Sequence, residues 1–387
     1  MMVELCSVEK CTGCGACYNV CPKQAISMQA DEEGFLRPSI DIGKCIDCGL
    51  CRKVCPPLNP VRKHSRVSYP IAAINKELDV LVRSSSGGMF SLLADWTFAH
   101  QGVVYGVVMD AEKHVFHTVA RNRSELASMR SSKYVQSDTR MVYTAIKADL
   151  KAERYVLFSG TPCQVAGLVN FLGKTDCSRL LTVDLVCHGT PSHKMFKAYL
   201  SKLAASLHID VEKIEKFGFR QEESWGYAPR FFLAGKPVYV NERQNLYTRL
   251  FLSSYLFRPC CYTCAYTTPE RVGDITIADF WGIGEKVPFR YDTSRGCSLV
   301  LPNSEKGKFL FNEVAQGLNF EQREWAEALK YNHQLYQQSR LPKDRSKAIE
   351  SLFNKSLEDT YNEFYNTPII RLRRCVGKVL RKLHLRK

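Results

Sequence analysis

The sequence lacks a long hydrophobic segment. No stretch reaches the roughly 18 apolar residues of a membrane-spanning helix, and no apolar run typical of a secretory signal peptide follows the opening residues MMVELCSVEK. We therefore expect the protein in the cytoplasm. Because thiols are kept reduced there, the 17 cysteines are not expected to form disulfides, and their number points to bound metal.

The chain also has no recognised nucleic-acid-binding motif to accompany its formal charge of +15. Residues 371–387 contain eight Lys and Arg and no acid, and subtracting these eight charges leaves +7 for the rest. Nucleic-acid binding is therefore not expected. The tail fits either a basic amphipathic helix that touches anionic lipid or an acidic partner, or a solvated terminus. Its apolar face consists of Leu372, Val376, Val379, Leu380 and Leu383.

A cysteine pattern that occurs twice in the first 58 residues is the most specific signal in the chain. Each copy has the spacing C-x2-C-x2-C-x3-C followed by proline, as in bacterial ferredoxins with two 4Fe-4S clusters. In those proteins the fourth cysteine of each run binds the other cluster. The first ligand set is then Cys11, Cys14, Cys17 and Cys55, and the second is Cys45, Cys48, Cys51 and Cys21. Zinc modules use four ligands in pairs, so zinc is the less favoured interpretation.

Composition divides the chain into regions and predicts an α+β protein. Between 71 and 190, apolar runs such as GVVYGVVM and YVLFSG alternate with helical stretches, which favours an α/β unit with some parallel strands. The predicted parts are a dicluster ferredoxin domain (1–58), a linker (59–70), an α/β domain (71–190), a second, mixed domain (191–305) and a helical region with the basic tail (306–387).

The stretch LFSGTPCQVAGL places one further cysteine at the start of an expected helix. Thr161 suits the N-cap and Pro162 the first helical position. Cys163 would then lie at the positive end of the helix dipole, which favours a thiolate. These residues alone leave three roles open for Cys163: a nucleophile, a metal ligand or a packed thiol.

Six short motifs follow one another in the order found in a known family. They are SSSGGMFSLL, SSKYVQS, FSGTPCQVAGL, DLVCHGTPS, RPCCYTCAY and DITIADFWGIG. Over about residues 70–305 the chain resembles the beta subunits of coenzyme F420-reducing hydrogenase and of related formate dehydrogenases, and 7-hydroxymethyl chlorophyll a reductase looks like a relative with the same core. The resemblance implies an oxidoreductase whose mixed α/β core binds FAD and at least one iron–sulfur cluster, with the ferredoxin module fused in front.

Four cysteines in these motifs form a candidate ligand set for a third 4Fe-4S cluster. Cys163 and Cys187 each follow an apolar strand, and both would lie at the carboxyl edge of an α/β sheet, where ligands collect. Cys261 and Cys264 have the two-residue spacing of a metal-binding loop, and Cys260 competes with Cys261 for this role. The other cysteines are interpreted as structural or incidental, namely Cys6, Cys177, Cys297 and Cys375.

The flavin is expected at the serine and glycine turn before the helix MFSLLADWTF. Hydroxyl groups, glycine N–H groups and a helix start form a cradle for a pyrophosphate, although a plain surface turn has the same composition. In the context of the resemblance, SSKYVQS is assigned to flavin contacts as well. The cofactor-binding candidates are Ser85, Ser86, Gly87, Gly88, Lys133, Tyr134 and Gln136.

Two other groups of polar residues keep alternative interpretations. His188 is a candidate catalytic proton donor, since imidazole titrates near neutral pH, and the alternative is a packed histidine. Asp274, Asp279 and Trp281 alternate with apolar residues, which fits either a strand with one acidic face or a place beside the flavin.

These predictions together describe an iron–sulfur flavoprotein with a mixed α/β core and a helical C-terminal region. Electrons would pass between the ferredoxin clusters and FAD, and on to or from an organic substrate or a deazaflavin, in a direction that the sequence does not fix. A ferredoxin or another redox protein is the expected partner. The alternative is an electron-transfer subunit of a larger complex with no substrate of its own.

Overall fold

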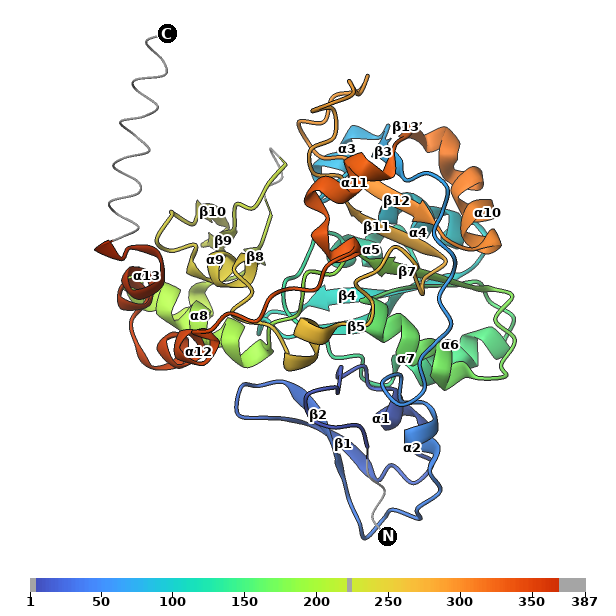
Figure 1. Cartoon of the computed structure of the whole chain (residues 1–387), viewed down its shortest axis with the longest axis horizontal. Helices are drawn as coiled ribbons and strands as arrows, with labels where there is room; N and C mark the ends of the chain where they lie inside the picture. The colour runs from blue at the N-terminus through green and yellow to red at the C-terminus, as the bar shows by residue number, and fades with distance from the viewer. Residues whose placement is uncertain (1–4, 221–224, 369–387) are drawn as a thin grey trace.

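A mixed β-sheet runs through the middle of the molecule (Figure 1). The computed structural model describes residues 5–220 and 225–368, and within them this sheet has eight strands. Across the sheet the strands are β13 (Leu318–Gln322), β3 (Ile71–Asn75), β12 (Ser298–Pro302), β11 (Ile275–Asp279), β7 (Leu180–Leu185), β6 (Val156–Ser159), β4 (Val103–Met109) and β5 (Val115–Ala120). The central strands β4, β6, β7 and β11 run parallel, and the outer strands pair antiparallel.

Helices cover both faces of this sheet, which is why central strands such as β4 and β6 are nearly continuous apolar runs. Side chains of β6 alternate between the two layers, because Leu157 packs on one face and Val156 and Phe158 on the other. The first face carries α4 (Met89–Ala99), α5 (Arg123–Leu126) and α10 (Glu305–Val314). The second carries α6 (Val142–Lys151), α7 (Pro162–Leu172) and α11 (Trp325–Tyr331). The short helix α3 (Leu78–Val82) follows β3.

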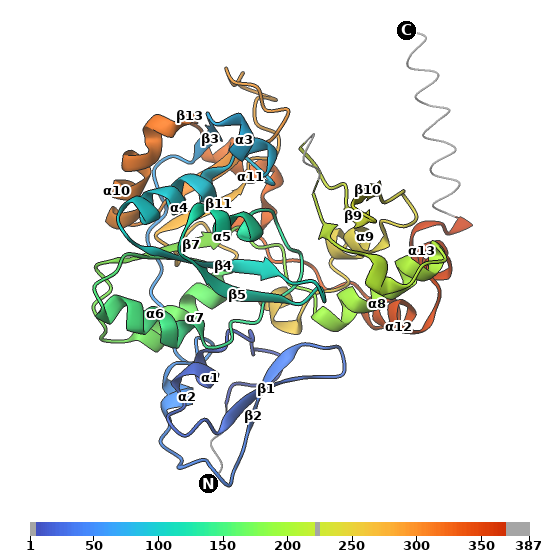
Figure 2. The same ribbon diagram turned by 180° about the vertical axis from the view of Figure 1, so that it is seen from behind.

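The ferredoxin domain lies against the α6 and α7 side of the sheet (Figures 1 and 2). It consists of α1 (Ala16–Val20), the antiparallel strands β1 (Ile26–Ala30) and β2 (Leu36–Ile40), and α2 (Leu50–Lys53). Hydrogen bonds fix it in place: the Thr139 hydroxyl donates to the Cys14 carbonyl at 3.1 Å, and the Asn19 amide donates to the Arg140 carbonyl at 2.7 Å.

A third group of elements packs beside the sheet around an aromatic core that includes Phe196, Tyr247 and Phe257 (Figure 2). Arg345 ties this group to the ferredoxin domain, since its Nη1 donates to the Glu33 carboxylate at 2.8 Å. The elements are α8 (His193–Ser206), β8 (Phe217–Gly218), β9 (Arg230–Leu233), β10 (Lys236–Tyr239), α9 (Leu246–Leu252), α12 (Arg345–Asn354) and α13 (Leu357–Tyr365). Short 3-10 turns complete the list: η1 (Ala127–Met129), η2 (Val211–Lys213), η3 (Pro259–Thr263), η4 (Ala315–Gly317) and η5 (His333–Leu335).

The mixed α/β fold with a ferredoxin domain in front agrees with the sequence prediction, and the structure adds three details. The predicted boundary between 190 and 191 does not separate two sheets, because β11 pairs directly with β7. The region beyond 305 is not purely helical, since β13 adds an edge strand there. The predicted linker is held on the core, where the Lys63 ammonium donates to the Ala265 carbonyl at 2.5 Å and His64 forms a β-bridge with Arg271.

The amphipathic tail predicted at 371–387, with Cys375, lies outside the described residues. Within residues 5–220 and 225–368, none of the helices has the length and apolar character needed to cross a membrane.

Candidate functional site

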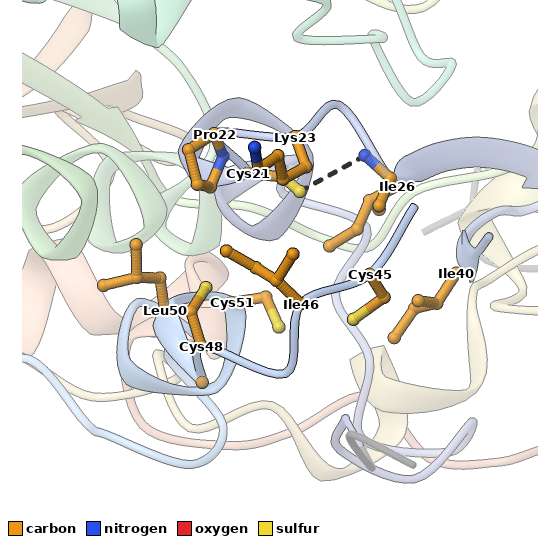
Figure 3. Close-up of a pocket in the computed structure, with 12 residues that line it drawn as sticks. Cys21, Pro22, Lys23, Ile26, Ile40, Cys45, Ile46, Cys48, Leu50 and Cys51 are labelled. Carbon is orange, nitrogen blue, oxygen red and sulfur yellow. Dashed lines mark hydrogen bonds between the residues drawn. The ribbon is translucent and has the colours of Figure 1, made fainter. Parts of the chain in front are cut away.

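The eight cysteines of the ferredoxin domain line two cavities of similar volume, about 350 and 370 Å³ with their solvent-open space included. The inner cavity, which is nearer the sheet, is lined by Cys11, Cys14, Cys17 and Cys55. The outer cavity is lined by Cys21, Cys45, Cys48 and Cys51 (Figure 3). Each cavity therefore combines three cysteines of one run with the last cysteine of the other, which is the crossed arrangement expected from the spacing.

The geometry of each run depends on glycine. Gly15 and Gly49 precede α1 and α2 with φ of 76° and 70°, in the left-handed region that glycine enters without strain. Among the described residues no three His, Cys, Asp or Glu side chains close on a single metal ion. A cubane instead spreads its four thiolates over four irons, so its ligands do not need to converge on one point.

The cysteines of the inner cavity are more buried than those of the outer cavity. Cys11, Cys14 and Cys55 are buried, and burial is the main cause that raises the pKa of the Cys14 thiol to about 11. Cys6, which the sequence suggests is only structural, also lines this cavity. Hydrogen bonds with Cys11 and Cys55 raise the pKa of the Cys6 thiol. The same hydrogen bond with Cys6 is the main cause that lowers the pKa of the Cys11 thiol to about 5.

The helix that carries Cys163 begins as predicted and touches the inner cavity. Thr161 is the N-cap and Pro162 the first residue of α7, and the Gln164 side chain accepts from the Thr161 N–H at 3.0 Å. Gly167 lies one turn after Cys163, and a Cβ on Gly167 would come within 2.9 Å of the Cys14 sulfur. One face of α7 therefore connects the inner cavity with Cys163.

The four cysteines proposed for a third cluster lie near one another, and Cys260 is with them. Cys163 and Cys187 follow the carboxyl ends of the neighbouring parallel strands β6 and β7, as expected. Burial raises the pKa of both thiols, and Cys187, Cys261 and Cys264 contribute to the rise at Cys163 through their own charge. This core cysteine group is Cys163, Cys187, Cys261 and Cys264.

The environment of Cys163 differs from the sequence expectation in one respect. The helix start at Pro162 was expected to favour a thiolate, but burial raises the pKa of the Cys163 thiol well above its usual value. In the protein without metal this cysteine is therefore a neutral thiol, which disfavours the role of an activated nucleophile.

A central hollow of about 1960 Å³, its open mouth included, lies at the carboxyl ends of the parallel strands. Its walls include Ser159 at the end of β6, Gly160 directly after it, Cys187 after β7 and Asp279 at the end of β11. In doubly wound sheets this is the edge where ligands bind. Cys187 belongs to both the core cysteine group and the hollow wall, so the two sites are adjacent.

Two sequence motifs that are about 45 residues apart meet at one end of the hollow. The Ser85 hydroxyl accepts from the Ser132 N–H at 2.8 Å and lies 3.1 Å from the Ser131 hydroxyl. Lys133 and Arg130 also line this end. Burial lowers the pKa of Lys133 to about 7 and lowers that of Arg130, and neither pairs with a carboxylate among the residues that the structure describes. The surplus of positive charge fits an anionic group such as a pyrophosphate.

Several predicted flavin residues do line the hollow, namely Ser85, Ser86, Gly88, Lys133, Tyr134 and Gln136. Gly87 is not among the lining residues. A Cβ at Gly87 would come within 2.1 Å of the Ala73 carbonyl, so this glycine is needed for the close approach of its turn to β3. The Gln136 side chain is also engaged elsewhere: it donates to the Thr12 carbonyl at 2.8 Å and accepts from Arg258 at 3.0 Å.

Tyr134 belongs to a polar and aromatic cluster at the wall of the hollow. Arg220 donates to the Tyr134 hydroxyl at 3.0 Å and to both oxygens of Asp279, at 3.0 and 3.1 Å. The Trp281 ring lies against the guanidinium and stacks on Trp225 at 4.6 Å. Asp279 and Trp281 thus lie at the hollow, whereas Asp274 accepts hydrogen bonds from Thr182 inside the sheet and has a structural role.

His188 lines the hollow beside Cys187, but both of its ring nitrogens have partners. The Gln334 amide lies 2.5 Å from Nδ1, and Nε2 lies 3.4 Å from the Leu252 carbonyl. Burial lowers the pKa of His188, so the imidazole is neutral at pH 7. This environment favours the packed histidine over the proton donor.

Sequence reasoning missed Arg130, Arg220 and Arg258. Arg130 directly precedes the motif SSKYVQS and Arg258 opens RPCCYTCAY, so proximity to the motifs was a usable signal for both. Arg220 lies in a segment with no motif, and only the fold brings it to Asp279.

Comparisons with known proteins agree with the resemblance. Residues 153–327 match the family model for the C-terminal part of the beta subunit of coenzyme F420 hydrogenase/dehydrogenase, and residues 10–57 match the 4Fe-4S dicluster domain. A chain of the F420-reducing [NiFe] hydrogenase complex from Methanosarcina barkeri has 16% sequence identity and a TM-score of 0.46, over 79% of this chain and 94% of that chain. No curated protein sequence matches. The two matches agree with the suspected family over residues 153–327 and with a dicluster ferredoxin domain over residues 10–57.

Proposed function

We propose that this protein is an iron–sulfur flavoprotein related to the coenzyme F420 hydrogenase/dehydrogenase beta subunits. Electrons would enter at the outer cavity and leave through FAD in the central hollow to an organic substrate or a deazaflavin. When bound, 4Fe-4S clusters supply one-electron carriers, and FAD joins these to a two-electron reaction.

The contiguity of the cysteine sites is the observation that carries this proposal. Cys14 of the inner cavity contacts Gly167 on α7, Cys163 lies one turn earlier, and Cys187 is shared with the hollow. The outer cavity is the solvent side, because Cys48 is exposed. An unbroken series of ligand sites between a surface and a large hollow is what electron transfer from a protein partner to a bound organic cofactor requires.

The residues of the hollow would divide the work of holding FAD. Ser85, Lys133 and Arg130 would bind the phosphates, since these three supply hydroxyl and cationic donors at one end. Tyr134 is held by Arg220 and would pack against the flavin. His188, neutral and hydrogen-bonded, would shape the wall next to Cys187. Cys163, Cys187, Cys261 and Cys264 would hold the third cluster.

The first test is the amount of iron, sulfide and flavin per chain in anaerobically purified protein. About 12 irons with one FAD would support the complete arrangement, at four irons per cubane. About 8 irons with FAD would restrict the clusters to the ferredoxin domain. About 8 irons without flavin would overturn the flavoprotein and leave an electron-transfer subunit.

A second measurement separates an enzyme from a subunit that only carries electrons. Reduced ferredoxin is added to the flavin-loaded protein without any partner, and flavin bleaching is followed. Flavin bleaching that is as fast as the catalytic turnover of the protein supports the proposal. If protein with full iron and flavin shows no bleaching, the proposal is contradicted.

A further inference from the structure

Arg258 is fully buried and has no acidic partner. Its side chain is 0% exposed, and no Asp or Glu carboxylate in residues 5–220 and 225–368 pairs with it. Other deeply buried arginines of the chain do pair, for example Arg220 with Asp279, Arg271 with Asp184 and Arg323 with Glu327. A buried cation without a counter-charge is unfavourable, so Arg258 needs an anion that protein carboxylates do not supply.

The contacts of Arg258 point to the inner cavity as the source of that anion. Its Nε donates to the Cys11 carbonyl at 2.6 Å, and its Nη2 lies 3.5 Å from the Cys11 sulfur. The same Nη2 donates to the Leu36 carbonyl at 2.9 Å, and Nη1 donates to the Gln136 side chain at 3.0 Å. Of these four acceptors only the Cys11 sulfur becomes an anion, and it does so when it binds iron.

The first cysteine run is shaped to receive this guanidinium. Gly13 has a φ of +66°, and a Cβ there would come within 2.7 Å of Nη1, so any other residue would displace the arginine. The centre of the buried Phe35 ring lies 5.5 Å from the guanidinium carbon. The charge is thus held in one place and excluded from water.

Arg258 also belongs to the loop of the core cysteine group. Its carbonyl accepts from the Cys261 N–H at 2.9 Å at the start of η3, and its own N–H donates to the Thr190 carbonyl at 3.1 Å. One residue therefore joins the inner cavity to the loop that carries Cys261 and Cys264. Among the described residues, the only Lys or Arg that lines the outer cavity is Lys23, and it is exposed to water.

We propose that Arg258 is a positioning residue that acts as the fixed counter-charge of the inner cluster site and raises its reduction potential above that of the outer site. This inference rests on the proposed function. Reduction adds one electron and one negative charge to the thiolate-bound group, and no bond or proton is involved. A cation held close by in a region of low dielectric stabilises that added charge, whereas an exposed lysine is screened by water and salt. Electrons then move downhill from the outer site to the inner site.

The test is a redox titration of the full, iron-loaded chain, followed by the electron paramagnetic resonance of the reduced clusters. Wild type is expected to show two ferredoxin-type waves at separate potentials. In R258Q the wave at higher potential shifts to more negative values. The equilibrium constant for its reduction falls at least tenfold, which is about 59 mV for one electron. The other wave stays in place. R258K, which keeps the charge, shifts less than R258Q.

R37Q is the matched control. Arg37 also acts on the Cys11 sulfur through its charge, but it already pairs with Asp31 at 2.8 Å. Removing it leaves the potential within a twofold change of the equilibrium constant. An equal shift in R37Q and R258Q would overturn the proposal, because any nearby cation would then serve.

Q136E covers the case in which R258Q does not fold. A carboxylate at this position keeps the size of the side chain and would pair with Arg258, so the cation is neutralised without leaving a space, and only the hydrogen bond to the Thr12 carbonyl is lost. The same negative shift is expected. If Q136E keeps the wild-type potentials, the inference is wrong.

Iron content separates failure of this inference from failure of the proposed function. A wild-type chain with fewer than about 8 irons has no inner cluster to tune, and the proposed function itself fails. Full iron with potentials that do not respond to R258Q or Q136E removes only the role of Arg258.

Discussion

The two cysteine cavities of the ferredoxin domain share a motif, a crossed ligand pattern and a volume, but not an environment. Cys14 in the inner cavity is 7% exposed and packs against α7, and the buried Arg258 lies beside Cys11. The outer cavity has the exposed Cys48, and the apolar Ile46 on its rim is 58% exposed (Figure 3). The motif determines which cysteines come together, and the surrounding packing determines whether the site faces the protein or a partner.

Removal of one cysteine from each cavity is expected to have the largest effect. Cys14→Ala and Cys48→Ala should each remove one cluster, about four irons per chain. Cys14→Ala should in addition lower the free energy of unfolding more, by about 1–2 kcal/mol, because this side chain is part of the apolar cluster under the sheet. Iron analysis and anaerobic thermal unfolding measure both effects. Equal unfolding temperatures for the two variants would contradict the packing difference.

A methyl group added to α7 next to the inner cavity also tests the difference between the two cavities. In most helices Gly→Ala is stabilising by about 0.5–1 kcal/mol, but at Gly167 the new Cβ would lie 2.9 Å from the Cys14 sulfur. Gly167→Ala is therefore expected to lower the iron content by displacing the inner cluster, with no change at the outer one.

Gly49→Ala is the control at the outer cavity. It has no atom within 4 Å of its added Cβ, and its φ of +70° should cost about 1 kcal/mol of stability without loss of iron. Full iron in Gly167→Ala would show that the inner site tolerates movement of Cys14.

The central hollow and the outer cavity differ in the same way in the burial of their lysines, Lys133 and Lys23. Burial lowers the pKa of Lys133 to about 7, so its ammonium is lost as the pH rises through 7. FAD binding to the metal-loaded protein should then weaken about tenfold between pH 6 and pH 8 in wild type, since one charge-assisted contact is lost. Lys133→Met should bind FAD weakly at both pH values, as measured by fluorescence titration. A Lys133→Met variant that keeps the wild-type pH profile would exclude this lysine.

Stability without FAD should depend on pH with the opposite sign. The unfolded chain keeps Lys133 protonated up to its ordinary pKa, so it binds more protons than the folded chain above pH 7, and stability from this residue rises with pH there. Lys23→Met is the control, because Lys23 is exposed at the outer cavity. This variant should change only how the rate of reduction of the protein by a ferredoxin depends on salt.

The sequence was informative where chemistry depends on local spacing. The eight ferredoxin cysteines, the N-cap at Thr161 and the strands before Cys163 and Cys187 follow from neighbouring residues alone. The packing role of Gly87 could not be predicted, because a glycine before a helix suits an anion cradle and a close sheet contact equally well, and only the fold brings Ala73 close to it.

Long-range contacts could not be predicted from such patterns. Arg258 reaches Cys11 across 247 residues, and β13 joins the sheet from a region whose composition is helical. Burial could not be predicted from the sequence either. It raises the pKa of the Cys163 thiol, whereas the helix start was expected to lower it.

The smallest effect is expected at His188. A proton donor in the chemical step contributes about 10²–10⁴-fold, but this imidazole is kept neutral by burial and is bonded at both nitrogens. His188→Gln should therefore change the rate of ferredoxin-driven flavin reduction by less than about threefold, well under the range for a proton donor. Gln334→Ala removes the partner of the His188 Nδ1 atom and is the matched control variant. If His188→Gln instead lowers this rate about a hundredfold or more with unchanged flavin content, the histidine is the proton donor of the hollow. The electron and the proton would then reach the cofactor from the same wall, through Cys187 and His188.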